Sequence, residues 1–131
     1  MGGRNMNEIN LSNGEWKIMN LLWESSPRTI AQLVEALSEK TDWNKTTIFV
    51  MLKRLIAKGA VRMDDSGRSH LYYPVISHDK ATAEETESFL EKVYNGSVGL
   101  LVSSLAGSDS LSEEDIAQLK EIINNAEKKL H

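Results

Sequence analysis

Residues 44–68 hold the side chains whose types and spacing best suit chemistry, and that chemistry is contact with DNA. Hydroxyl groups can bond a base edge or a phosphate, apolar side chains can pack on thymine methyl groups, and basic side chains neutralise phosphates. Thr46 and Thr47 carry the hydroxyls, and Phe49 and Val50 are the candidates for thymine methyls. The full set of candidate DNA-binding residues is Asn44, Lys45, Thr46, Thr47, Phe49, Val50, Lys53, Arg54, Arg62 and Arg68.

Each of these assignments has a simpler structural alternative. Threonines at the start of a helix more often cap it than read a base. Phe49 could instead belong to the core, lysines on a helix face are usually only solvated, and Arg54 could pair with a glutamate inside the fold. DNA contact is favoured by the co-location of an amphipathic helix, a basic excess and a turn that ends in Ser66-Gly67-Arg68.

The remaining reactive side chains do not form a catalytic or metal-binding pattern. His70, His78 and His131 are scattered, without a metal-ligand spacing such as His-Glu-x-x-His. Glu84-Glu-Thr-Glu87 lies near the expected start of a helix, where carboxylates simply complement the helix dipole. Because the chain has no cysteine, thiol nucleophiles and thiolate metal sites are excluded. The sequence therefore predicts no enzyme activity, no metal site and no cofactor.

Size and composition limit the class of protein. The chain has 131 residues, of which 40% are hydrophobic and 26% charged, so it is the size of one domain or of a small domain with an appendage. No apolar run reaches the roughly 18 residues that span a bilayer, and no apolar signal-peptide core follows Arg4. The absence of cysteine fits a reducing compartment. We therefore expect a cytoplasmic protein without a membrane partner.

The net charge of −4 conceals an uneven distribution. Residues 1–80 contain eleven basic and nine acidic residues, whereas residues 81–131 contain four basic and ten acidic residues. Residues 43–73 alone contain six basic and two acidic residues. A locally basic N-terminal part joined to an acidic C-terminal part predicts one surface for a polyanion and another for a different partner.

Three helices are expected to position the candidate residues, over 13–24, 29–39 and 44–58. Ser12 and Glu15 form a capping box ahead of the first helix, Thr29 and Gln32 form another ahead of the second, and Asn44 can cap the third. Apolar residues at three-to-four spacing predict an amphipathic helix in each range. The buried side expected for the third helix consists of Ile48, Met51, Leu52, Leu55 and Ile56.

The apolar period changes from near 3.6 to near 2 after Gly59, which is itself a candidate for a left-handed C-cap. Val61 and Met63 alternate with Arg62, and Asp64-Asp-Ser-Gly67 is a turn signal. In a second run, Leu71, Tyr73 and Val75 alternate with His70 and Tyr72, and Pro74 closes the run as an edge strand allows. Together these features predict a β-hairpin.

Three more helices are expected after the hairpin, over 79–94, 97–106 and 112–130. Asp79 or a neighbour caps the first of them, Asn95-Gly96 ends it, and Ser112-Glu-Glu-Asp115 begins the last. The order of helix, helix, helix and hairpin is typical of a winged helix-turn-helix. The expected fold class is therefore mainly α with a small β-hairpin. We assign residues 7–78 to a winged helix-turn-helix DNA-binding domain and exclude residues 1–6 from the fold.

Several motifs resemble the penicillinase repressor family of transcriptional regulators (BlaI/MecI/CopY type). The resemblance covers nearly the whole chain from about Ile9. Its fairly specific part is the Glu-Trp and Leu-Trp pairs that end at Trp16 and Trp23, together with the Phe-Leu and Tyr-x-Gly pattern from Phe89 to Gly96. The motifs are Glu15-Trp-Lys-Ile-Met-Asn-Leu-Leu-Trp23, Thr46-Thr-Ile48 with Leu52-Lys-Arg-Leu55, Lys58-Gly59, the stretch from Arg68 to Tyr73, and Phe89-Leu-Glu-Lys-Val-Tyr-Asn-Gly96.

The resemblance implies a homodimeric repressor whose winged helices bind a palindromic DNA operator and whose C-terminal helices dimerise. Residues 79–131 then form a helical dimerisation region; the alternative is that their apolar residues fold back on the winged helix. A further alternative for the whole chain is a winged-helix protein-interaction module without specific DNA binding. The candidate dimerisation residues are Phe89, Val93, Val98, Leu101, Val102, Leu105, Ile116, Leu119, Ile122 and Ile123.

The sequence departs from two subgroups of this family. Copper-responsive members carry a C-terminal cysteine cluster, which is absent here. The β-lactamase repressors are inactivated by cleavage within the dimerisation helices, and Ser104–Leu105 stands at the matching bond, which makes an inducing protease a possible partner. Phe49 stands where the antibiotic-resistance repressors have an arginine, so their operator cannot be transferred unchanged.

Overall fold

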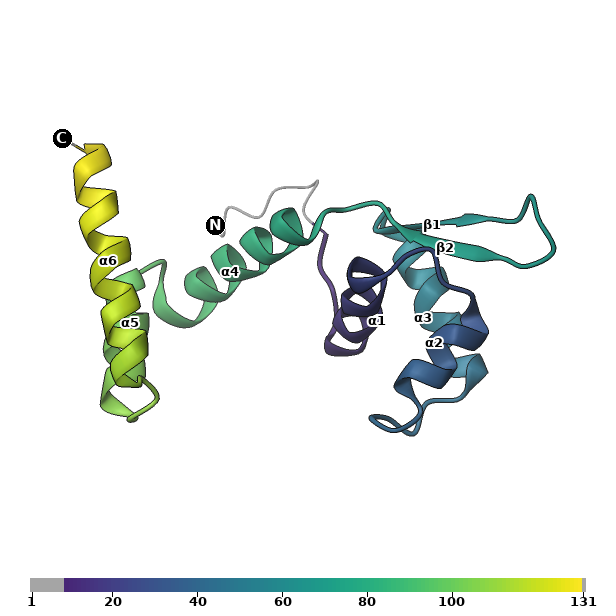
Figure 1. Cartoon of the computed structure of the whole chain (residues 1–131), viewed down its shortest axis with the longest axis horizontal. Helices are drawn as coiled ribbons and strands as arrows, with labels where there is room; N and C mark the ends of the chain where they lie inside the picture. Colours follow the sequence, from purple (N-terminus) through teal and green to yellow (C-terminus); the bar gives the residue numbers. More distant parts are fainter. Residues whose placement is uncertain (1–8, 131) are drawn as a thin grey trace. The chain divides into compact units, whose positions relative to one another are not determined.

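A computed structural model describes residues 9–130, which form six helices and a two-stranded antiparallel sheet (Figure 1). The mainly α fold with one hairpin that the sequence predicts is confirmed. Residues 1–8, with Arg4 and the start of the expected domain, and His131 lie outside the described residues. The elements are α1 (Asn13–Glu24), α2 (Ile30–Leu37), α3 (Lys45–Ala57), β1 (Val61–Asp64), β2 (Leu71–Pro74), α4 (His78–Tyr94), α5 (Val98–Gly107) and α6 (Glu113–Leu130).

The predicted helix starts are confirmed by the hydrogen bonds of their caps. Ser12 and Glu15 form a reciprocal capping box at α1, and Thr29 and Gln32 form another at α2. Asn44 caps α3. The cap of α4 is Ser77, two residues before the expected Asp79, because the Ser77 hydroxyl accepts a hydrogen bond from the Lys80 backbone N–H at 3.1 Å; Asp79 lies in the first turn of the helix.

The chain divides into two compact units, and the division falls after Thr86, inside α4. The first unit contains α1, α2, α3, the hairpin and the beginning of α4. The second contains the end of α4 with α5 and α6.

The core of the first unit forms where α1, α2 and α3 meet the base of the hairpin. Each helix buries residues at three-to-four spacing, so the apolar stripes face one another. Ile56 was expected on the buried side of α3 but is exposed, because the one residue that separates it from Leu55 turns its side chain about 100° around the helix axis. The most deeply buried side chains are Ile18, Met19, Leu22, Leu33, Ile48, Leu52 and Leu55.

The hairpin pairs in a register that buries Tyr72 and exposes Val75. Tyr72 lies opposite Met63 and also exchanges two backbone hydrogen bonds with Arg28, which adds a short third segment to the sheet. This extra pairing draws Tyr72 toward the core, although the sequence places it in the polar half of the alternation. Burial raises the pKa of the Tyr72 phenol, which therefore stays neutral.

The second unit contains no buried side chain among its described residues. Its elements are nonetheless well delimited. Asn95 and Gly96, both with positive φ, end α4 as the sequence predicts, and Ser97 caps α5. At α6, Ser112 and Asp115 exchange hydrogen bonds of 3.0 Å, and the helix is acidic in its first turn and basic in its last. These charges match the helix dipole.

Candidate nucleic-acid interface

The exposed face of α3 brings together the central candidates for DNA contact. Ile48, Leu52 and Leu55 fix the orientation of the helix because all three are fully buried. Thr46, Phe49, Val50 and Lys53 lie on the opposite, exposed side. Phe49 is 44% exposed and Val50 42%, so the alternative in which Phe49 belongs to the core is wrong.

Positive charge lies beside these apolar side chains. The Lys53 Nζ lies 5.6 Å from the centre of the Phe49 ring, within range of a cation–π interaction. Lys45 and Lys53 are one turn before and one turn after Phe49, so the three form a single row along the helix. Arg54 is also exposed and, within residues 9–130, forms no ion pair, so it does not pair with a glutamate inside the fold.

The first turn of α3 uses two of the candidate residues for its own cap. The Asn44 Oδ1 accepts hydrogen bonds from the Thr47 backbone N–H at 2.9 Å and from the Thr47 hydroxyl at 3.1 Å. Thr46, by contrast, is exposed. The structure thus gives Asn44 and Thr47 a capping role and leaves Thr46 as the accessible hydroxyl.

The hairpin carries the other two basic candidates away from α3. Arg62 lies on β1, with its guanidinium 3.9 Å from the centre of the Tyr73 ring on the facing strand. Arg68 lies in the connecting turn and is exposed. In the same turn, hydrogen bonds from Ser66 lower the pKa of Asp64, which keeps that carboxylate charged. Figure 1 shows the hairpin projecting beyond the helices of the first unit, as a wing does.

An ion pair that sequence reasoning missed joins the beginning of α1 to the end of α3. Lys58 donates to the Glu15 carboxylate and, at 2.7 Å, to the backbone oxygen of Asn10. Burial raises the pKa of Glu15, but hydrogen bonds from Lys58 and from the Ser12 backbone, with the charge of Lys58, outweigh burial and lower that pKa. The Ser12–Glu15 motif predicted only the cap, since the pattern holds no information about Lys58.

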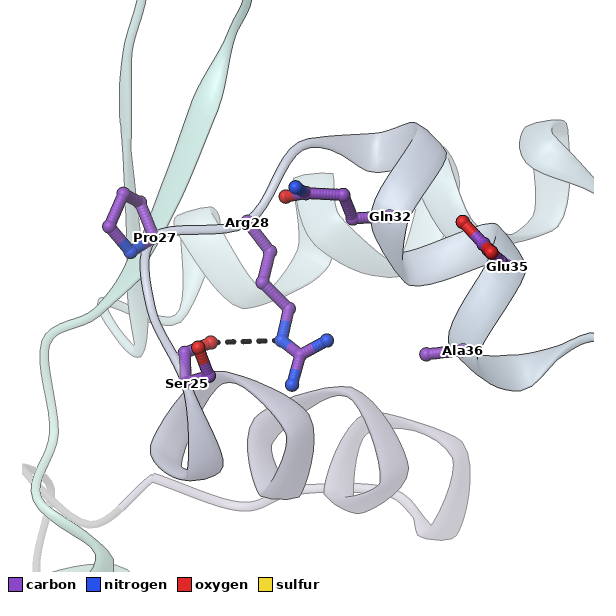
Figure 2. A pocket seen from close by; sticks show the side chains of 6 residues that line it. All are labelled: Ser25, Pro27, Arg28, Gln32, Glu35 and Ala36. Carbon is purple, nitrogen blue, oxygen red and sulfur yellow. Dashed lines mark hydrogen bonds between the residues drawn. The ribbon is translucent and has the colours of Figure 1, made fainter.

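An open hollow of about 350 Å³, which no sequence motif predicts, lies between the end of α1 and α2 (Figure 2). The Arg28 side chain crosses it, because its Nε donates to the backbone oxygens of Ser25 at 2.8 Å and Leu21 at 3.1 Å. The lining also includes Gln32 and Glu35 of α2 but no residue of α3 or of the hairpin. The hollow is therefore separate from the exposed face of α3.

Other kinds of site find no support among the described residues. No group of three or more histidine, aspartate or glutamate side chains in residues 9–130 could hold a metal ion. His70 lies in the wing, and His78 packs edge-on against Trp23, with ring centres 5.1 Å apart. None of the helices in the described part of the chain is both long and apolar enough to cross a membrane.

Known repressors are similar to this chain in sequence. The family model described as "Penicillinase repressor" matches residues 11–125. The penicillinase repressor of Bacillus licheniformis is 33% identical over 113 residues, which are 86% of this chain and 88% of that protein. The methicillin resistance regulatory protein MecI of Staphylococcus aureus is 26% identical over 114 residues, covering 87% of this chain and 93% of that one.

A solved structure supports the assignment of the fold. The DNA-binding domain of the repressor BlaI, determined in solution, is similar with a TM-score of 0.50 and 32% identity, over 56% of this chain and 89% of that domain. The winged helix-turn-helix expected from the sequence is thereby confirmed. The chain belongs to the penicillinase repressor family and is a DNA-binding repressor.

Proposed function

We propose that this repressor acts in the cytoplasm as a homodimer on a palindromic operator, with α3 of each copy in the major groove and the wing on the adjacent backbone. The observation that carries the proposal is the exposed face of α3, where apolar and hydroxyl side chains lie between two lysines. In helix-turn-helix proteins such a face reads base edges, while basic residues around it hold phosphates. Arg62 and Arg68 extend the basic residues to the hairpin.

Substitution of the basic residues tests the DNA-binding face. Lys53→Ala and Arg68→Ala should each weaken operator binding and reduce the slope of log affinity against log salt by about 1, because each removes one phosphate contact. Mobility shifts at a series of salt concentrations measure both quantities. Lys92→Ala, on an exposed side chain in the last turn of α4, is the matched control. Unchanged binding by both variants would refute this assignment of the face and favour a protein-interaction module.

The second unit is proposed as the dimerisation region because its apolar side chains lack a core of their own. In α6, Ile116, Leu119, Ile122 and Ile123 recur at three-to-four spacing, so they form one stripe. Phe89 contacts Tyr94, with ring centres 5.9 Å apart, yet remains 41% exposed. Val93, Val98 and Leu105 are exposed as well, and Leu101 and Val102 are only half-buried. Burial of such a stripe against a second copy would remove this apolar surface from water.

Truncation tests the dimer. A chain that ends after Gly96 should be monomeric by light scattering, whereas the full chain should be dimeric. Its affinity for a palindromic duplex should fall at least 100-fold, while its affinity for a half-site duplex should stay within about twofold, since two linked half-sites bind with a high effective concentration. A truncated chain as dimeric as the full chain would place the interface elsewhere.

Relief of repression by proteolysis is the remaining part of the proposal. Ser104 and Leu105 are both exposed, and they lie in the interior of α5, which buries none of its side chains. Local unfolding of such a helix costs little, so a protease could reach the bond between them. Cleavage there would separate α6 from the DNA-binding unit. A chain ended after Ser104 should therefore share the properties of the chain ended after Gly96.

A further inference from the structure

From Lys45 to Lys53, the exposed face of α3 lacks the side chains that read purines most specifically, and Arg54, one turn after Val50, is the first arginine of the helix. Guanine is read best by a bidentate arginine, and adenine by a bidentate asparagine or glutamine. Between Lys45 and Lys53 the chain contains no arginine, asparagine or glutamine. Asn44 is the nearest amide, but its Oδ1 already accepts two hydrogen bonds from Thr47. An adenine contact through both atoms of that amide would therefore break the cap of the helix.

Two apolar side chains occupy the centre of the face instead. Phe49 and Val50 are adjacent in sequence and more than two-fifths exposed, although every other apolar residue from Ile48 to Leu55 is at least half-buried. In the major groove, the thymine methyl is the only apolar group that a base pair presents. Contact with such methyls would remove both side chains from water, whereas contact with a polar base edge would leave hydrogen-bonding groups of the base without partners.

The neighbouring lysines explain how Phe49 can reach a base. Lys45 and Lys53 lie four residues before and after it, so phosphate contacts by both would place the ring between them, over the floor of the groove. The 5.6 Å cation–π contact holds Lys53 beside the ring. An ammonium group is a compact charge on a flexible stem, which suits phosphate better than a bidentate base contact.

We infer that this repressor recognises thymine methyl groups through Phe49 and Val50, so that its operator half-site carries thymines opposite the centre of α3. The inference rests on the proposed function, because it names the base chemistry that the same helix reads. It makes the methyl group, rather than a hydrogen bond, the source of specificity at those positions.

Replacement of operator thymines by uracil, which lacks the methyl group, tests this inference directly. The full chain is first used to select bound duplexes from a random pool. Each thymine of the selected half-site is then replaced in turn by uracil, as deoxyuridine, which removes only the methyl group. For the unsubstituted protein, at least one replacement should weaken binding about fourfold, as expected for the loss of one buried methyl. For Phe49→Ala or Val50→Ala, the same replacement should have an effect below twofold.

Controls separate this readout from folding and from the proposed function. Both α3 variants should keep the unsubstituted melting temperature within a few degrees, because both side chains are exposed. Val75→Ala removes another exposed apolar side chain of the first unit, outside α3. This variant should lose as much affinity as the unsubstituted protein when thymine is replaced by uracil. The inference is overturned if no replacement of thymine weakens binding, or if each replacement weakens binding by the α3 variants as much as by the unsubstituted protein. Neither result would contradict the proposed function as a repressor. If selection enriches no duplex, the proposed function itself fails.

Discussion

Leu52→Ala is expected to lower the free energy of unfolding by about 3 kcal/mol. Leu52 has no exposed surface and lies in the core where α3 faces the other helices. Truncation to alanine removes three methyl or methine carbons from that core and leaves a cavity, so the transfer of apolar surface and the lost packing contribute together. Urea unfolding followed by tryptophan fluorescence measures the change, because Trp16, Trp23 and Trp43 all pack against this core.

Phe49→Ala on the same helix is the matched control for stability. Phe49 is larger than leucine but 44% exposed, so its truncation should change the free energy of unfolding by less than about 1 kcal/mol. The two variants should therefore separate cleanly: one destabilises the fold, and the other impairs DNA recognition in a folded protein. Equal destabilisation by both would mean that the exposed face of α3 is covered by another part of the chain.

Removal of Glu15 is expected to produce the second large effect. Its side chain is 1% exposed, and Lys58, its partner, is 35% exposed. Glu15→Gln should cost about 2 kcal/mol, below the range for fully buried pairs because water reaches the lysine. Because the folded-state pKa of Glu15 lies below its ordinary value of 4.5, its stabilising effect is present above that value and is lost as the pH falls through the folded-state pKa.

The acid limb of the stability curve measures this effect. Between neutral pH and pH 4.5 the difference between the unsubstituted protein and Glu15→Gln should be constant, and below pH 4.5 it should shrink. In Lys58→Met, the free energy of unfolding should fall less steeply as the pH is lowered. Burial still raises the pKa of Glu15 in this variant, but the hydrogen bond and the charge of Lys58 no longer lower it. Glu24→Gln is the control: Glu24 is 74% exposed at 3.9 Å from Arg28, and its removal should change little. Identical acid limbs in all four proteins would contradict the role of the ion pair.

Local patterns in the sequence predicted most of the fold. The caps at Ser12, Thr29 and Asn44 depend on residues three positions away, so they are visible in a short stretch of sequence. The buried stripe of α3 follows equally from the spacing of Ile48, Leu52 and Leu55. Interactions across the fold were not predictable in this way: Lys58 is 43 residues from Glu15, and Tyr72 turns inward because of its pairing with Arg28.

The candidate site was predictable as a set of residues but not as a set of roles. Asn44 and Thr47 carry the same hydrogen-bonding groups as a base-reading pair, and only their bonds to each other identify the cap. Phe49 was ambiguous because an aromatic residue next to Ile48 widens an apolar stripe as well as it extends a recognition face. Its exposure follows from the crossing of α1, α2 and α3, which the periodicity of a single helix does not determine.

The pairing of Lys58 with Glu15 also affects how such a repressor would search a chromosome. One of the six positive charges between residues 43 and 73 is neutralised within the fold, so it displaces no counterions from DNA. Random sequence then attracts the protein less strongly, while contacts specific to the operator are unaffected. Since a genome offers millions of competing sites, a lower affinity for random sequence shortens each unproductive encounter. The carboxylate that secures the end of α3 would thereby increase the share of time spent at the operator.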